Sequence, residues 1–227
     1  MKHLKSYKLF ESIDSEINFD KVVEVLSTEC SEFLDLLEKL NIENGTYKIN
    51  YANGYGSSTT QCLYRGHKLW DDGNIVKGFW KIKPFENRLS RDTKSDISKL
   101  LDEGFEKKFG IPLRSKGVFA SKDWSIAADY GRHKNEAFLF FPKNGFRYFW
   151  NPQIDDLFTE LRDGCDFYYK EPVFWSHSEW ADFQDIVDGY REGGIQYAKY
   201  QEITFICDEY YLLDLDYYDQ FLNYFIK

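Results

Sequence analysis

Hydrophobic and polar residues recur at helical spacing over several stretches of the chain. The longest stretch covers 18–40, where apolar residues face one side and Glu and Lys separate them, and Asn44-Gly45 ends it as a turn. We expect further helices over 95–109, 124–130, 152–161, 178–190 and 217–225. Gly110 and Gly131 follow two of these segments and are typical helix stops.

Short apolar runs between these segments predict β-strands over 61–65, 117–120, 137–141, 202–207 and 210–214, with 78–82 as a short strand or an extended loop. Asp208-Glu209 separates the last two strands, which is close to hairpin spacing. Because strands and helices are mixed without a regular βαβ alternation, the pattern favours an α+β fold over a doubly wound sheet. We expect one domain over 1–227, with an N-terminal helical segment over 1–60 and a strand-rich core over 61–227.

Composition and charge narrow the classes of protein that remain. Hydrophobic residues make up 43% and aromatic residues 19% of the chain, which excludes a disordered protein. The formal net charge of -9 repels phosphate backbones, so nucleic acid is an unlikely partner. Basic residues gather in two places, which either face an anionic cofactor or form solvated surfaces: Lys77, Lys81, Lys83, Arg88 and Arg91, and Lys107, Lys108, Arg114 and Lys116.

Several kinds of site and location lack support in the sequence. The four cysteines form no CxxC pair and the four histidines are scattered, so we expect no metal site. The nucleotide motifs GxGxxG and GxxxxGK[ST] and the zincin motif HExxH do not occur. The N-terminus lacks an apolar signal core and no run approaches ~18 apolar residues, so we expect a reduced cytoplasmic protein without a membrane partner.

Three short pieces carry the candidate chemistry. Tyr64-Arg65-Gly66 offers a guanidinium and bare backbone, Ser121 follows a predicted strand, and Glu202 opens another. Each has an ordinary structural interpretation, namely an Arg beside a turn glycine, a helix N-cap and a strand-edge carboxylate. Their order, however, is Arg, then Ser on a strand, then Glu at the start of a strand.

In this order the chain resembles the mono-ADP-ribosyltransferase superfamily of the Arg-Ser-Glu type. The segment 117–130 (GVFASKDWSIAADY) matches the family's strand, serine and short helix, although Lys122 and Asp123 replace the usual second and third hydroxyls. Segments 88–93, 114–117 and 144–157 resemble bacteriophage members that modify host proteins. The resemblance covers roughly 63–214 and implies an ADP-ribosyltransferase-like fold, a mixed or antiparallel β core with flanking helices.

The resemblance also implies roles for residues and NAD as the substrate. Arg65 would meet the NAD phosphates or ribose, and Gly66 would let backbone groups approach the nicotinamide carboxamide. Ser121 would orient Glu202, and Glu202 would hold the ribose 2′-OH as positive charge develops on the sugar. Further NAD contacts would come from residues that have equally plausible places in the core or at a helix cap: Phe119 or Trp124, stacking on nicotinamide, and Arg91.

The segment 188–200 would be the loop that meets the acceptor protein, with Tyr197, Tyr200 and Gln201 as its candidate contacts. Arginine-modifying members carry Glu two residues before the catalytic Glu; here that position is Tyr200, so the acceptor side chain stays open. The sequence therefore predicts an enzyme that transfers ADP-ribose from NAD to a protein. Two alternatives remain, a catalytically inactive binding or inhibitor protein on the same fold and ADP-ribosylation of nucleic acid.

Overall fold

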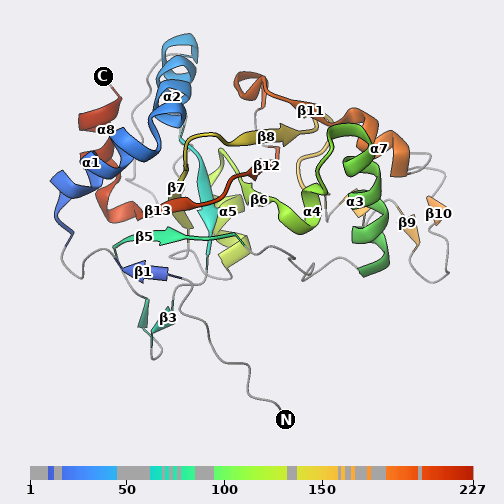
Figure 1. The fold of residues 1–227 in the computed structure, drawn as a ribbon, viewed down its shortest axis with the longest axis horizontal. Helices are drawn as coiled ribbons and strands as arrows, with labels where there is room; N and C mark the ends of the chain where they lie inside the picture. The colour runs from blue at the N-terminus through green and yellow to red at the C-terminus, as the bar shows by residue number, and fades with distance from the viewer. Residues whose placement is uncertain are drawn as a thin grey trace. The chain divides into compact units, whose positions relative to one another are not determined.

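A computed structural model describes residues 10–12, 17–44, 62–67, 70–71, 74–75, 78–84, 95–131, 137–157, 160–161, 165–166, 173–174, 183–198 and 201–226. The chain divides into two compact units. Unit 1 comprises 1–83, 123–145 and 207–227, and unit 2 comprises 84–122 and 146–206. Each unit combines helices with its own antiparallel sheet (Figure 1), which confirms the predicted α+β class. The assignment of 1–60 and 61–227 within one domain stays a prediction.

Unit 1 is built on a five-stranded sheet. Its order is β1 (Phe10–Ser12), β5 (Phe79–Ile82), β13 (Tyr210–Asp214), β7 (Ala137–Pro142) and β2 (Tyr64–Gly66), with every pair antiparallel. The strands β7 and β13 are buried at every position. This matches the continuous apolar runs that predicted them, a pattern typical of strands covered on both faces. The short strands β3 (Trp70–Asp71) and β4 (Asn74–Ile75) pair separately.

The predicted helix over 18–40 is wrong in one respect, because it is two helices, α1 (Phe19–Glu29) and α2 (Ser31–Asn44). Asn144, in the turn after β7, binds both helices at the break. Its Nδ2 donates to Thr28 O at 3.1 Å, and its Oδ1 accepts from the Glu32 N–H at 3.0 Å. These bonds satisfy backbone groups that helix ends leave without partners. A residue over 100 positions away in the chain thus stabilises the break.

Two more helices of unit 1 follow the sequence pattern. Helix α5 (Trp124–Gly131) packs on β2 and β7, and α8 (Tyr218–Phe225) ends the chain after the 3₁₀ turn Leu215–Tyr217. Asp123 caps α5, since its Oδ1 accepts from the Ser125 N–H at 2.8 Å. The N-cap role considered for Ser121 therefore belongs to Asp123.

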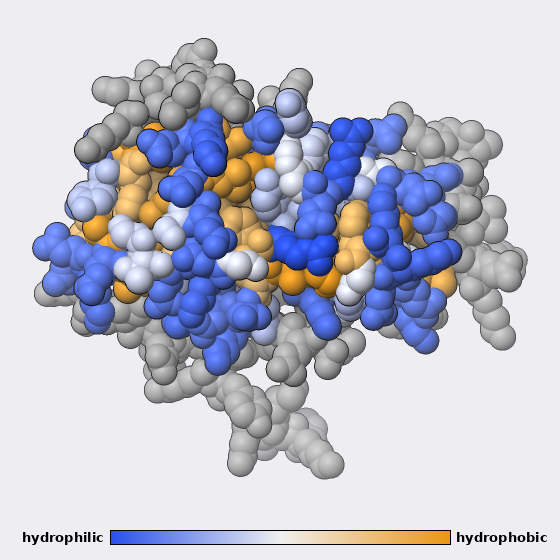
Figure 2. Space-filling model, turned by 45° about the horizontal axis from the view of Figure 1, so that its top comes forward, coloured by the Kyte–Doolittle hydropathy of each residue, from blue (hydrophilic) through white to orange (hydrophobic). Residues whose placement is uncertain are grey.

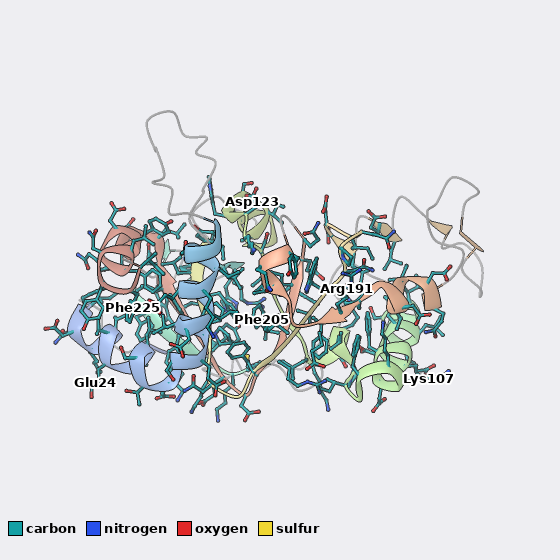
Figure 3. All side chains as sticks on the ribbon, turned by 90° about the horizontal axis from the view of Figure 1, so that it is seen from above. Glu24, Lys107, Asp123, Arg191, Phe205 and Phe225 are labelled. Carbon is teal, nitrogen blue, oxygen red and sulfur yellow. The ribbon has the colours of Figure 1, made fainter. Side chains whose placement is uncertain are left out.

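Unit 2 contains a four-stranded antiparallel sheet in the order β11 (Arg191–Glu192), β8 (Arg147–Trp150), β12 (Ile203–Ile206) and β6 (Val118–Ala120). The helices α3 (Ser95–Phe109), α4 (Leu113–Lys116) and α7 (Phe183–Gly189) belong to this unit, and α3 packs on α4 and α7. Phe205 lies in the central strand β12 (Figure 3). The core beside the sheet is an apolar cluster from these elements and their loops: Ile97, Leu101, Phe105, Leu113, Phe149, Ile154, Leu157, Leu161, Ile186, Val187 and Tyr190.

Three predictions about elements need correction or limits. The hairpin around Asp208-Glu209 is wrong, because β12 pairs with β6 and β8 whereas β13 pairs with β5 and β7. Glu209 instead accepts hydrogen bonds within unit 1, at 2.9 Å from both Lys81 Nζ and Lys143 Nζ. The helix expected from 152 is also wrong at its start, since 152–156 are not helical and helical backbone begins at Leu157. Residues 178–182 of another predicted helix lie outside the described part.

The surface of the described residues carries mostly hydrophilic side chains on the face drawn in Figure 2. Within the described ranges, no helix has both the length and the apolar character needed to cross a lipid bilayer.

The pair β9 (Cys165–Asp166) and β10 (Val173–Phe174) completes the described strands of unit 2.

Candidate functional site

The register of the unit 2 sheet brings Ser121 and Glu202 together. Ile203 on β12 pairs with Ala120 on β6, so Glu202, which directly precedes β12, and Ser121, which directly follows β6, each lie one residue beyond this pair. Paired residues on antiparallel strands have neighbouring side chains, and these two residues flank such a pair. Both side chains are buried, with 2% of Ser121 and 6% of Glu202 exposed. Two of the three predicted site pieces are therefore neighbours.

Asn151 extends this row across the sheet. Ile203 also pairs with Trp150 on β8, so Asn151, which directly follows β8, lies one residue beyond this pair as well. Asn151 is 1% exposed; its Nδ2 donates to Ile186 O at 3.2 Å and its Oδ1 accepts from the Gln153 N–H at 2.9 Å. The end of the sheet thus presents three buried polar side chains in a row.

Arg114, on α4, binds the carboxylate of this row. Its Nη1 donates to Glu202 Oε1 at 3.3 Å, and only 9% of the Arg114 side chain and 5% of the Glu202 side chain are exposed. The Arg114 Cζ also lies 4.7 Å from the centroid of the Phe119 ring, a cation–π contact. Phe119 is two residues before Ser121, so it lies on the same sheet face. Phe119 therefore supports Arg114 in this structure.

The backbone of α4 is held by contacts with α3 and packs closely on strand β12. Asp102 on α3 accepts the backbone N–H of Arg114 at 2.6 Å and that of Ser115 at 3.1 Å. Burial raises the pKa of Asp102, and the hydrogen bonds from Ser115 and Arg114 oppose that rise. Gly117 lets the chain pass Thr204 of β12, since a Cβ at this position would overlap the Thr204 methyl group. These contacts fix the position of the Arg114 backbone, from which its side chain extends.

Tyr190 supplies a buried hydroxyl in the same neighbourhood. Its ring packs edge-on against Phe105 with centroids 4.8 Å apart. Burial raises the pKa of Tyr190, and the negative charge of Glu202 raises it further. Tyr190 therefore stays a neutral phenol at physiological pH.

The segment before Glu202 is anchored at several points. The Glu202 N–H donates to Asp155 O at 2.8 Å, and Gln201 Nε2 donates to Asp155 Oδ1 at 3.1 Å. Further back, the 3₁₀ turn Ile195–Tyr197 buries Ile195 and leaves Tyr197 71% exposed. Among the described residues of this segment, Tyr197 is thus the large aromatic side chain that faces solvent.

Lys122, next to Ser121, ties this segment to β6. Its Nζ donates to Ala198 O at 2.7 Å. Burial lowers the pKa of Lys122 to about 8, because a charged amine is poorly solvated there. Lys122 therefore holds the backbone at Ala198 to the end of β6.

Other predicted site residues lie in unit 1 or outside the described part of the chain. Arg65 and Gly66 lie on β2 and Trp124 begins α5, all in unit 1, and the Arg65 Cζ lies 5.4 Å from the centroid of the Tyr210 ring. Arg91 and Tyr200 lie outside the described residues. Of the predicted residues, the structure groups Phe119, Ser121 and Glu202, with Gln201 adjacent.

Sequence reasoning did not assign Arg114, Asn151 or Tyr190 to the site. Arg114 was one of a basic group expected to face either a cofactor or solvent, yet it is buried against a carboxylate. Asn151 follows β8, which was not predicted, although the run RYFW at 147–150 is rich in β-forming aromatic residues. Recognising that strand would have pointed to the residue after it.

No family model, curated protein or solved structure matches this chain in the three comparisons. In the described part of the chain, no group of three or more His, Cys, Asp or Glu side chains is arranged to hold a metal ion. The chemistry of the site therefore has to be argued from its own residues.

Proposed function

We propose that this protein is an ADP-ribosyltransferase-like enzyme that transfers ADP-ribose from NAD to a protein acceptor. The observation that carries the proposal is the placement of Glu202 beside Ser121, at the matching ends of two paired strands. The resemblance in sequence assigns these two residues to one site, and they are far apart in the chain. Their adjacency is what the assignment requires.

The reaction would break the bond between nicotinamide and its ribose. The bonding electron pair leaves with nicotinamide, and a nucleophilic atom of the acceptor then bonds to the same ribose carbon and loses its proton. Positive charge develops on the sugar between these events, as in glycoside cleavage. A fixed carboxylate that accepts the ribose 2′-OH hydrogen bond stabilises this charge.

The local structure supports Glu202 in this role. Its backbone N–H bonds Asp155 O, its side chain is bound by Arg114, and the strand that follows it is central in its sheet. A group mounted in this way keeps its geometry during the reaction. The role of Arg65 toward the NAD phosphates stays a prediction, since Arg65 belongs to unit 1.

A matched pair of substitutions tests the proposal. The protein is incubated with NAD labelled in its adenosine half and with cell extract, and both nicotinamide release and label transfer are measured for the wild type, Glu202→Gln and Glu192→Gln. Glu192 also pairs with an arginine of the same sheet, Arg147, but 44% of its side chain is exposed. We expect Glu202→Gln to lower both rates by about 10²–10³-fold and Glu192→Gln to leave them unchanged.

A second candidate function rests on the burial of the ion pair. A carboxylate that is 6% exposed and bound by an arginine also suits a structural role in a binding protein that does not cleave NAD. The same assay separates the two. Absence of nicotinamide release with every extract favours the binding protein, whereas release that survives Glu202→Gln removes Glu202 from catalysis.

A further inference from the structure

We infer that Arg114 is a positioning residue for Glu202, which holds the carboxylate ionised and in place inside unit 2. The effect of Arg114 on catalysis rests on the proposed function, whereas its effect on the charge of Glu202 does not. The inference goes beyond the predicted Arg-Ser-Glu set, in which Arg114 has no part.

The contacts of Arg114 hold its guanidinium against the Glu202 carboxylate. Its guanidinium lies on the Phe119 ring and donates to Glu202, and its Nε is buried without a hydrogen-bond partner among the described residues. Its backbone N–H is held by Asp102. The side chain cannot turn to solvent without losing both its contact with the Phe119 ring and its hydrogen bond to Glu202.

The cost of removing Arg114 falls on Glu202. A carboxylate buried away from water disfavours its charged form unless a cation or hydrogen-bond donors compensate. Arg114 supplies the positive charge at 3.3 Å. Without it, the buried Glu202 would take up a proton at higher pH and could no longer accept a hydrogen bond with both oxygens.

Among the described residues, the titratable groups with defined contacts near the pair are acidic, phenolic or bound elsewhere; Lys122, for example, donates to Ala198 O. Asp102 is negative when ionised and accepts the backbone N–H of Arg114. The backbone carbonyl of Asp155 accepts the backbone N–H of Glu202 and carries no charge. Tyr190 interacts electrostatically with Glu202, Arg114 and Asp156. Neither a phenol nor a carboxyl group can carry positive charge, so Tyr190 and Asp156 cannot replace Arg114. Lys108 is a cation on α3, but its Nζ donates to the carbonyls of Val187, Asp188 and Tyr190 at the end of α7. Arg114 is the cation bound to the Glu202 carboxylate in the described part of the chain.

The test is the pH dependence of nicotinamide release by the wild type, Arg114→Met and Arg114→Lys. If only ionised Glu202 is active, activity falls on the acid side as Glu202 is protonated. We expect Arg114→Met to move this acid limb upward by about 1–3 pH units and to lower kcat below it, with a smaller shift for Arg114→Lys. An unchanged acid limb with a raised KM for NAD would overturn the inference, because Arg114 would then act on NAD itself.

Arg147→Met is the matched control. Arg147 also pairs with a glutamate, Glu192, and its Cζ lies 5.0 Å from the centroid of the Phe149 ring in the same sheet. It does not touch Glu202, so its loss removes an ion pair and a ring contact without changing the acid limb. An equal shift in Arg147→Met would attribute the effect to loosening of the sheet and overturn the inference.

A second measurement keeps the inference separate from the proposed function. The Glu202 side-chain carbon is titrated by ¹³C NMR without NAD in the wild type and the Arg114 variants, with Glu202→Gln assigning the signal. We expect protonation at higher pH when Arg114 is replaced, and an identical titration would overturn the inference. Absence of nicotinamide release by the wild type refutes the proposed function alone. If Arg114→Met does not fold, Arg114→Lys must still show the smaller shift, and no shift would overturn the inference.

Discussion

Gly117 offers the sharpest structural prediction, because it sets the distance between α4 and the sheet. A Cβ built on Gly117 would overlap both Leu113 O, a backbone atom of α4, and Thr204 Cγ2 on β12. The backbone of Gly117 is in an ordinary extended conformation, with φ -77° and ψ 149°, so backbone strain does not contribute. Gly117→Ala therefore tests packing alone.

The magnitude follows from which neighbours are able to move. Overpacking usually costs about 1–3 kcal/mol, and here one of the two overlapping atoms is a backbone carbonyl that cannot rotate away. We expect a loss of about 3 kcal/mol in the free energy of unfolding. Thr204→Ser alone removes one buried methyl group and costs about 1 kcal/mol. The double variant relieves the overlap with the methyl group but not with Leu113 O, so it should cost about 1–2 kcal/mol less than the sum of the two.

Urea unfolding followed by fluorescence measures these values, because the midpoint and slope give the free energy of unfolding. Gly104→Ala is the control: its Cβ would meet Val187 Cγ2 at 2.8 Å, which is a side-chain atom able to shift, and alanine favours a helix interior. We expect that variant within about 1 kcal/mol of the wild type. A Gly117→Ala variant within about 0.5 kcal/mol of the wild type, or strict additivity with Thr204→Ser, would refute the packing argument.

Three further predictions concern single side chains. The rate at which an acylating reagent modifies Lys122, followed by mass spectrometry from pH 7 to 10, should have its midpoint near the pKa of about 8, and a midpoint near 10.4 would contradict the assigned burial. Burial and Arg65 lower the pKa of His67 to about 3, so between pH 6.5 and 3 the unfolded chain binds a proton that the folded chain does not, and stability falls as pH falls. His67→Gln should therefore lose stability less steeply than the wild type in urea unfolding from pH 7 to 4, and equal slopes would argue against a neutral His67 in the folded chain. Tyr197→Ala removes the exposed ring and should lower label transfer to protein more than it lowers NAD hydrolysis; equal losses would show that the ring does not contact the acceptor.

The local pattern of the sequence was sufficient for elements whose partners lie within the same segment. Helix α3 has the predicted length because its apolar residues share one face and Gly110 ends it, with a positive φ of 75° that glycine adopts readily. The strands β7 and β13 were predicted from continuous apolar runs, and both are fully buried. Such signals need only the spacing of residues along one stretch of chain.

Elements that depend on distant partners were not predictable in this way. The break between α1 and α2 is stabilised by Asn144, and the two strands around Asp208-Glu209 join different sheets although their spacing resembles a hairpin. In both cases a contact with a distant segment outweighs the preference of the local sequence. The residues involved carry no mark of this in their own neighbourhood.

The candidate site likewise combines features that the local sequence predicted with features that depend on distant contacts. Ser121 and Glu202 were identified from residue type, order and the strands beside them, and the described Gly117–Gly131 segment has the predicted strand and helix. Their adjacency, the place of Asn151 beside them and the ion pair with Arg114 come from strand register and from the packing of α4 on β12. The sequence by itself determined elements such as α3, β7 and β13, because the spacing of buried residues within one segment is a local property of the chain. Only the tertiary structure decided which strands pair and which cation meets the buried carboxylate, because these depend on the summed packing of segments that are remote in sequence.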